Sequence, residues 1–403
     1  AAQRASLTRY NKAWALANLG RLDEAEAAFG RARAEASAEV QWLIDDGLAW
    51  LAYYRKDYDR AEAAFRAILR KNPDAYLSRK GLGFVALQRE DYEEALKALI
   101  FSLTQNPNQV LTSYTIPANR FLEAKQFLEA KEILELGERA YPRSADVQFL
   151  LARTYKGLKD TEKAAQKAVA AVFLAPVYIH PRFDDLEIEP AQAKDAYHAM
   201  GWGLYYAGKS AEAVARFEQY FAAGGDKPTG FTGLGWVQLA LGKSEKAEES
   251  FRKALEAGDK ANGLVGIGWA QLGADRVEDA EKSFREALKQ VPGHASAQAG
   301  LGRIQFRKRA FVKEGWEHYS KGKYKAALAA FDAKREEAAA AGNPATEDGR
   351  GWALLALGRP KEAAEAFRAA LEIDSDFFYS KSGLIAAQRA SLTRYNKAWA
   401  LAN

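Results

Sequence analysis

The chain has 403 residues, of which 48% are hydrophobic and 28% are charged, enough apolar side chains for a buried core beneath a well-solvated surface. Its 58 basic and 53 acidic residues leave a net charge of +5, and because these charges are interspersed we expect no nucleic-acid partner. There is no Cys, which excludes disulfides and Cys-ligated metals, and no apolar run approaches the roughly 18 residues of a membrane span.

From the first residues onward, the sequence is a succession of paired apolar-periodic stretches of about 12 to 15 residues, the pattern of amphipathic helices. One string recurs, Gly-x-x-x-x-Ala-x-x-x-Phe-x-x-Ala, first at residues 20–32. It returns, intact or as a close variant, at residues 57–73, 91–107, 127–142, 164–176, 242–254, 277–292 and 358–370. We therefore expect helical hairpins, with Gly at the turn, Ala where the two helices cross, and Phe filling the gap to the next hairpin.

These motifs resemble the tetratricopeptide repeat, whose first-helix Leu-Gly pair is matched at Leu82-Gly83 and Leu234-Gly235. The resemblance covers nearly the whole chain and implies an all-α, right-handed superhelical solenoid without a sheet. We count ten hairpins, two of them with a long first helix (residues 295–321, and 376–385 continued by the sequence of 1–19). The expected organisation is hairpins 1–5 in residues 1–176, an inserted loop in 177–190, hairpins 6–10 in 191–375, and the start of a further unit in 376–403.

The segment 177–190 breaks the repeat with Pro181, Pro190 and a group of acidic residues, and we interpret it as a loop that crosses the solenoid surface. His180 and the nearby Asp184 suggest a cation site, but the spacing of a metal site is absent, so a solvated acidic loop is the preferred interpretation. We find no nucleophile elbow, phosphate loop or dinucleotide fingerprint. The expectation is a protein that is not an enzyme and has neither a cofactor nor a metal.

The first helices carry an aromatic stripe. Eight of the ten hairpins have an aromatic residue directly after the recurrent small residue of the first helix: Trp14, Trp50, Phe84, Trp202, Trp236, Trp269, Trp316 and Trp352. Tyr53, Tyr205 and Tyr319 follow one turn later in three of them. One hypothesis is a concave groove that stacks on a peptide or a glycan. The other is that these rings pack between successive first helices of the solenoid.

Residues 1–18 and 386–403 are identical, so the sequence has a period of 385 residues. Three interpretations are open: a tandem array of 385-residue modules, polymerisation of separate chains, or a duplication made artificially. The first two give an open solenoid that continues from one unit into the next. The ends of a solenoid normally need polar capping helices. Head-to-tail contacts that do not close into a ring build filaments. The side chains expected at such an end-to-end contact are Tyr10, Leu16, Tyr395, Trp399 and Leu401.

The leading functional hypothesis is a structural repeat protein that forms a filament with itself as partner. The alternative is a soluble scaffold that binds a peptide or glycan in the aromatic groove. A glycan-processing enzyme has only the aromatic stripe in its favour. The lack of Cys, the pI of about 9.0 and a first residue other than Met favour a location outside the cell or in its envelope, with the cytoplasm as the alternative.

Overall fold

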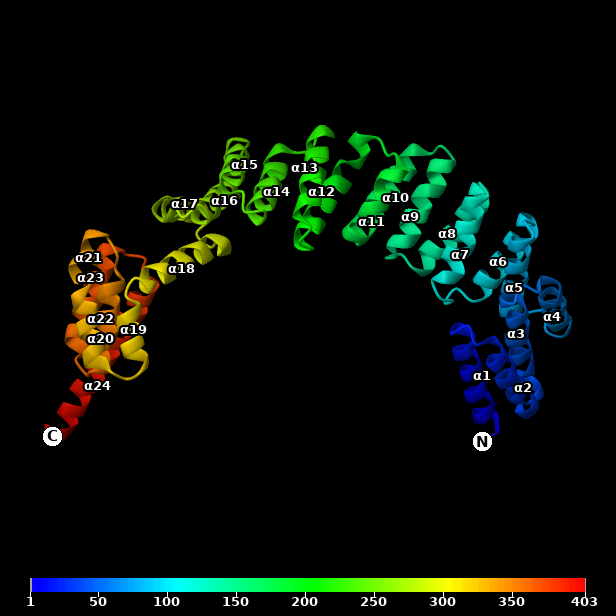
Figure 1. Cartoon of the computed structure of the whole chain (residues 1–403), viewed down its shortest axis with the longest axis horizontal. Coiled ribbons are helices and arrows are strands. Elements are labelled where there is room, and N and C mark those ends of the chain that lie inside the picture. The colour runs from blue at the N-terminus through cyan, green and yellow to red at the C-terminus, as the bar shows by residue number, and fades with distance from the viewer. Residues whose placement is uncertain (1, 403) are drawn as a thin grey trace. The chain divides into compact units, whose positions relative to one another are not determined.

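The computed structural model describes the backbone of residues 2–402 and the side chains of residues 7–393. Over the described backbone it contains 24 α-helices, one short 3₁₀ turn and no strand, which confirms the expected all-α hairpin fold (Figure 1). The chain divides into two compact units, Ala1–Gly225 and Asp226–Asn403, and each unit is a stack of helical hairpins.

Within the described residues, no helix combines the length and the apolar character that crossing a membrane requires.

Unit 1 has six hairpins and one additional helix, α11 (Pro176–Phe183). Each hairpin pairs two successive helices, and the first helices of neighbouring hairpins also touch, as between α1 and α3 or α7 and α9. The hairpins are α1 (Ala2–Asn18) with α2 (Leu22–Glu35), α3 (Ala38–Tyr54) with α4 (Tyr58–Lys71), α5 (Tyr76–Gln88) with α6 (Tyr92–Gln105), α7 (Thr112–Glu123) with α8 (Phe127–Ala140), α9 (Ala145–Gly157) with α10 (Thr161–Leu174), and α12 (Pro190–Tyr206) with α13 (Ser210–Ala222).

Unit 2 has four hairpins and three further helices. The hairpins are α14 (Lys227–Ala240) with α15 (Ser244–Glu256), α16 (Lys260–Gly273) with α17 (Val277–Gln290), α19 (Lys313–Ser320) with α20 (Tyr324–Ala333), and α22 (Ala345–Ala356) with α23 (Pro360–Ile373). The further helices are α18 (Ala295–Ala310), α21 (Arg335–Ala340) and α24 (Phe378–Ala402).

Every hairpin turn places one residue in the left-handed conformation. Five turns use Gly with φ between 70° and 75°, namely Gly20, Gly208, Gly242, Gly322 and Gly358. The other five use Lys56, Glu90, Lys125, Lys159 and Asp275, with φ between 59° and 64°. Glycine is therefore favoured but not required, because a side chain in this region costs only about 1–2 kcal/mol.

The hairpins interlock through Phe side chains of the second helices. Phe251 is fully buried, and its ring lies between Gly235 of its own hairpin and Gly266 of the next first helix. Phe284, Phe331 and Phe367 also lie between two glycines. Phe29 and Phe65 contact a glycine of the next first helix only, and Phe217 contacts Gly201 of its own hairpin. Glycine is needed there because any Cβ would enter the space of the ring. The expected role of Phe, filling the gap to the next hairpin, is thus what the structure shows.

The segment 177–190, predicted to be a loop, is instead mostly helical: α11 is followed by the 3₁₀ turn η1 (Asp184–Leu186). Ile179, Phe183 and Leu186 are buried against α10 and α12, so apolar burial holds the segment in place. Pro176 occupies the first turn of α11 and Pro190 begins α12, where proline is favoured, whereas Pro181 lies inside α11 and removes one backbone donor from this short helix.

The predicted long first helix at 295–321 is also interrupted. It turns at Phe311 and Val312 into α18 and α19, whereas α24 continues unbroken over 25 residues. Val312 is buried beside Phe331 and Phe377, and this burial is the reason for the turn. The two helices then serve different neighbours, since α18 packs on α17 and α19 packs on α20.

We predict that Gly266→Ala destabilises unit 2. A Cβ at Gly266 would lie 2.1 Å from Cδ1 of Phe251, and that ring is already in contact with Gly235 on its other side. Overpacking costs about 1–3 kcal/mol, of which better helix propensity returns at most about 1 kcal/mol. Urea unfolding followed by circular dichroism measures the change. Gly302→Ala is the control, because no atom lies within 4 Å of its new Cβ and it should be neutral or slightly stabilising. Equal effects of the two substitutions would contradict the interlocking role of Phe251.

Candidate protein-binding surfaces

The Trp residues of the stripe pack edge-on against the interlocking Phe rings. In seven hairpins a Trp and the Phe fifteen residues later have ring centroids 5.2 to 5.7 Å apart and ring planes 69° to 88° apart. The pairs begin at Trp14, Trp50, Trp202, Trp236, Trp269, Trp316 and Trp352. Trp50 is buried, and the other six remain partly exposed. Each indole therefore has a packing role and also an accessible part.

The predicted Tyr residues extend these aromatic groups. Tyr53, Tyr205 and Tyr319 are half-buried, and their ring centroids lie 5.4 to 5.6 Å from the Trp of the same helix. Phe84 is also half-buried and lies 5.5 Å from Trp50. The most exposed aromatic surface belongs to the adjacent Tyr206, which is 78% exposed and stacks on Trp202 with a ring-plane angle of 24°. The aromatic-groove hypothesis stays a prediction, with Tyr206 as its best platform.

The indole N–H groups of Trp202 and Trp269 have side-chain partners one helix turn or one hairpin away. Trp202 Nε1 donates to His198 Nε2 at 3.1 Å, and Trp269 Nε1 donates to Ser296 Oγ at 2.9 Å. His198, which the sequence left without a role, is therefore part of the packing of α12. The polar edges of these Trp residues are committed to the protein, so a ligand would meet the rings rather than the N–H groups.

Two buried carboxylates join successive first helices. Asp46 of α3 accepts a hydrogen bond from Ser78 Oγ of α5 at 2.6 Å, and Asp348 of α22 accepts one from Ser380 Oγ of α24 at 3.0 Å. Asp46 is 1% exposed and Asp348 is fully buried. Burial raises the pKa of Asp46 to about 7 and that of Asp348 to about 6, against the opposing effect of these hydrogen bonds and of nearby cations.

The sequence interpretation missed this pair of sites. Its signal is the recurrence of Asp-Gly four residues before a stripe Trp, at Asp46-Gly47 and Asp348-Gly349, with a Ser 32 positions after each Asp. Nothing in the composition distinguishes these two carboxylates from the many solvated ones. Only the stacking of first helices shows that they are buried.

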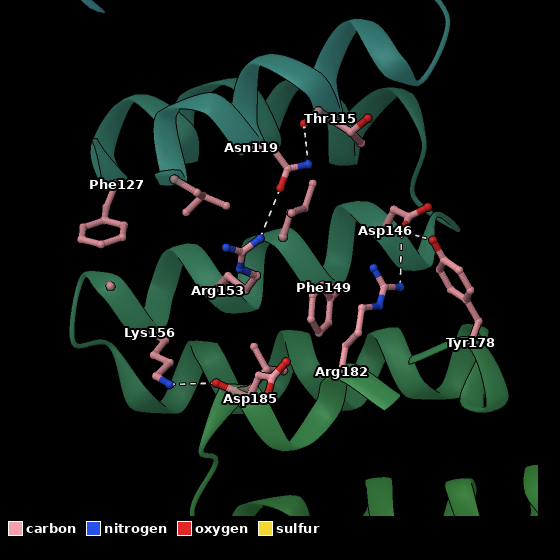
Figure 2. Close-up of a pocket in the computed structure, with 14 residues that line it drawn as sticks. Thr115, Asn119, Phe127, Asp146, Phe149, Arg153, Lys156, Tyr178, Arg182 and Asp185 are labelled. Carbon is pink, nitrogen blue, oxygen red and sulfur yellow. Dashed lines mark hydrogen bonds and ion pairs between the residues drawn. The ribbon is translucent and has the colours of Figure 1, made fainter. Parts of the chain in front are cut away.

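A cleft of about 770 Å³ opens in unit 1 between α7, α9 and the segment α11–η1 (Figure 2). The cationic side chains of Arg153, Lys156 and Arg182 line it, together with the carboxylates of Asp146 and Asp185. Because α11 forms one wall, this cleft exists only where the repeat is interrupted. These residues were not singled out from the sequence, since they belong to three elements whose proximity depends on the stack.

The cations of the cleft differ in how they are held. Arg153 Nη1 donates to the amide oxygen of Asn119 at 3.2 Å, and no carboxylate of the described residues pairs with it (Figure 2). Lys156 Nζ donates to the carbonyl oxygen of Asp185 at 2.9 Å and pairs with the Glu187 carboxylate at 2.8 Å, and Arg182 Nη2 lies 3.7 Å from Asp146 Oδ1. The Arg182 guanidinium lies over the rings of Phe149 and Tyr178, 4.7 and 4.3 Å from their centroids. The cleft thus presents donors to an incoming acceptor at positions fixed by packing.

Two carboxylates of the insertion are paired, Asp184 with Arg216 and Glu187 with Lys156. Arg216 of α13, which is 4% exposed, donates to both carboxylate oxygens of Asp184 at 2.7 and 2.9 Å. Its Nε donates to His180 Nδ1 at 2.9 Å. Burial, followed by the charge of Arg216, lowers the pKa of His180. These side chains fasten α11 to α13, and among the described residues no group of three or more acidic or His side chains is arranged to hold a metal.

The side chains predicted for end-to-end contact are described only in α1. Tyr10 and Trp14 lie against Phe29 of α2, with ring centroids 5.8 and 5.6 Å away, and Leu16 is buried in the same cluster. Tyr395, Trp399 and Leu401 lie outside the described side chains. The structure therefore shows the packing of the first of the two identical segments, against α2 and α3.

We predict that Asp46→Asn stabilises the protein at pH 8 and has little effect near pH 4. Because the folded-state pKa of Asp46 is raised to about 7, the folded chain holds a proton that the unfolded chain releases near pH 4. The contribution of Asp46 to wild-type stability therefore falls as the pH rises from about 4 to 7, and Asn removes that loss, which is up to about 4 kcal/mol at pH 8.

Urea unfolding of Asp46→Asn and wild type at several pH values measures this difference. The other titrating groups cancel, because they are common to both chains. Ser78→Ala serves as a second variant, which should destabilise at all pH values because it removes a hydrogen bond to the buried group. A gain from Asp46→Asn that does not vary with pH would contradict the raised pKa.

Comparison with known families agrees with this geometry. Three family models, each described as a tetratricopeptide repeat, together match more than half of the chain, at residues 47–106, 198–262 and 265–321, at 348–377, and at 6–31. No curated protein matches the sequence at a significant level.

Several solved structures are similar to the chain. A tetratricopeptide repeat protein from Parabacteroides merdae is 15% identical, with a TM-score of 0.34, over 66% of this chain and 99% of that one. The TPR domain of P58(IPK) is 17% identical, with a TM-score of 0.25, over 88% of this chain and 99% of that one. The MamA protein is 18% identical, with a TM-score of 0.24, over 46% of this chain and 92% of that one. On the repeated family matches and the stacked hairpins, this chain belongs to the tetratricopeptide repeat family.

Proposed function

We propose that the protein is a self-assembling repeat scaffold, in which residues 386–403 of one copy take the place of α1 on the next copy. One observation carries this proposal: residues 386–403 have the same sequence as residues 1–18, and α1 is a helix whose packing surface is known. Tetratricopeptide repeats are in general scaffolds for protein interaction rather than catalysts, which agrees with an assembling role.

The site that α1 occupies is apolar and well packed. Tyr10, Trp14 and Leu16 of α1 pack with Phe29 of α2 in one buried cluster that also includes Leu51 of α3. Trp14 and Phe29 form the edge-on pair found in six other hairpins. A helix with the same sequence offers the same side chains to this site.

Residues 395, 399 and 401 supply the same Tyr, Trp and Leu as residues 10, 14 and 16. Exchanging one helix for the other therefore preserves the local contacts, and its local free-energy change is close to zero. Any additional contact made by α23 and α24 then favours the exchanged form. Since the donated helix and the accepting site lie at different places in the chain, such contacts are head-to-tail and build a filament rather than a closed dimer.

A covalent tandem array would create the same junction within one polypeptide. The denatured mass of the polypeptide from its natural source distinguishes the two forms, because an array is far heavier than 44.4 kDa. In both forms, the α1 site of one 385-residue period is filled by a helix that follows α23 of the preceding period.

We predict that replacing Trp by Ala has opposite effects on self-association at position 14 and at position 399. Trp399→Ala removes the Trp of the donated helix and should weaken association by roughly 30-fold, the equivalent of about 2 kcal/mol. Trp14→Ala weakens the hold of the chain's own α1 on its site, so it should strengthen association. Sedimentation velocity over a range of protein concentrations measures both.

The double variant provides the control, since it should return association towards that of the wild type. A wild-type chain that stays monomeric at high concentration would overturn the proposal. Equal effects of Trp14→Ala and Trp399→Ala would do so as well, because they would mean that the two identical segments do not compete for one site.

A second function is favoured by the cleft of unit 1: binding of an acidic peptide. Lys156 and Arg182 are paired there with Glu187 and Asp146, whereas Arg153 has only the neutral Asn119 as a partner. A peptide carboxylate would give Arg153 an ion-pair partner, and the rings of Phe149 and Tyr178 would contact the apolar side chains of the peptide.

We predict that a short fluorescein-labelled peptide of alternating Glu and Leu binds to this cleft, and that Arg153→Glu weakens its binding by roughly tenfold. Fluorescence anisotropy measures the affinity, which should also fall with added salt. Lys246→Glu, an equal change of charge on the exposed face of α15, is the control. If the two variants lose affinity equally, the attraction is general and the cleft is not the site.

A further inference from the structure

Unit 2 contains a junction that a regular stack of hairpins lacks. The loop between α23 and α24 contacts α17 and α18, although 66 to 89 residues separate the partners along the chain. The contacts are Arg285 Nη2 to Asp374 Oδ1 at 2.8 Å, Lys308 Nζ to Asp374 Oδ2 at 3.4 Å, and Gln305 Nε2 to the carbonyl oxygen of Asp376 at 2.9 Å. Asp374 and Gln305 are buried in this contact.

The α23–α24 pair repeats the α17–α18 pair 83 positions later. The matched residues are Phe284 and Phe367, Arg285 and Arg368, Gly300 and Gly383, Leu301 and Leu384, and Gln305 and Gln388. Their packing also agrees, because a Cβ at Gly300 or at Gly383 would lie 2.4 or 2.3 Å from the ring of the matched Phe. Helices α23 and α24 thus carry residues that match those of the surface on α17 and α18 that receives the loop in unit 2.

The loop has a second version as well. Residues 11–82 repeat residues 313–384 without a gap, 302 positions earlier. The matched residues include Trp14 and Trp316, Phe29 and Phe331, Asp46 and Asp348, Trp50 and Trp352, Phe65 and Phe367, and Ser78 and Ser380. The two offsets, 83 and 302, together give the 385-residue spacing of the identical segments. The segment that corresponds to the docked loop is therefore Asn72–Tyr76, with Asp74 in the place of Asp376.

The second receiving surface is open in the single chain. A cleft of about 570 Å³ lies between α23 and α24 and is lined by Arg368, Gln388, Ser391 and Leu392 among others. Leu392 is 61% exposed and Gln388 is exposed, whereas the matched Gln305 is 7% exposed under its loop. The corresponding loop is also accessible, since Asp74 is exposed.

We infer that the α23–α24 surface binds the loop Asn72–Tyr76 of a second copy of this chain. In this contact Arg368 faces Asn72, as Arg285 faces Asp374 in unit 2, and Gln388 faces the backbone of Asp74. The inference rests on the proposed self-assembly and adds to it a second contact, outside the 18 repeated residues.

Where the two junctions have different side chains, the replacement on the receiving surface is accompanied by a replacement on the loop side. In unit 2 the Arg309 guanidinium lies 4.1 Å from the ring centroid of Tyr379. The residues at the matching positions are Leu392 and Leu77, so a cation–π pair is replaced by an apolar pair. Asn72 in place of Asp374 replaces the ion pair by a hydrogen bond from the charged guanidinium to a neutral amide oxygen, so the contact is less dependent on salt.

Cysteine cross-linking tests this contact directly, because the chain has no Cys of its own. Chains carrying Asn72→Cys are mixed with chains carrying Arg368→Cys and treated with a short bismaleimide. We expect a cross-linked dimer that needs both variants and is lost when Trp399→Ala is added to the Arg368→Cys chain. Arg285→Cys with Asp374→Cys in one chain is the positive control, and Lys246→Cys mixed with Asn72→Cys is the negative control.

The outcomes separate this inference from the proposed function. If sedimentation shows association but the mixture yields no cross-linked dimer, the loop contact is wrong and the helix exchange stands. If the chain does not associate, both fail. As a second measurement, Arg368→Glu should weaken association by roughly tenfold. Arg66→Glu, the matched position on α4, should leave it unchanged, and equal effects would also overturn the contact.

Discussion

The contact between a buried Phe ring and a glycine of the next first helix is the constraint on which the rest of the solenoid depends. A hairpin cannot bury its own apolar face, so the chain is stable only when hairpins stack. The ring of Phe251 or Phe284 fills the space between two first helices, and glycine on each side allows the helices to approach closely. The spacing of the hairpins is thus set by the thickness of an aromatic ring.

The same contact explains why the aromatic stripe is only partly available to ligands. Each stripe Trp packs edge-on against the Phe that separates its helix from the next. Much of each indole surface is therefore used in packing, and only the remainder is accessible to a ligand. One opening that the stack leaves is polar. Where α11 interrupts the repeat, the cleft lined by Arg153 and Arg182 offers donors whose positions are fixed by helices on three sides.

The repeats are not equivalent, and their differences recur over distances longer than one hairpin. The turn at Val312 and the docked loop at Asp374 create a junction inside unit 2, and both of its sides recur in the sequence, the α17–α18 surface 83 positions later and the loop 302 positions earlier. One junction is thus satisfied within the chain. The matching elements of the other, the α23–α24 surface and the loop at Asn72, offer the matched residues to another copy, although α24 has no turn at the position that corresponds to Val312. Self-assembly by this route needs no new type of contact, only the use of an existing one between copies.

The sequence by itself determined the family, the all-helical fold and the number of hairpins, because small and large residues recur at fixed offsets that only stacked hairpins satisfy. It also showed the identity of residues 1–18 and 386–403, which no structure was needed to see. It failed where a short segment had no periodic pattern to read. Residues 177–190 were assigned to a loop, although Ile179 and Phe183 are buried in a helix.

Only the tertiary structure decided which polar residues matter. Asp46 and Asp348 look like any other helix carboxylate until the next first helix covers them and raises their pKa. The cations of the unit 1 cleft come from separate elements, and the docked loop of unit 2 joins residues up to 89 positions apart. Burial and proximity over such distances depend on how hairpins stack in three dimensions, and a local pattern of residues carries no information about them.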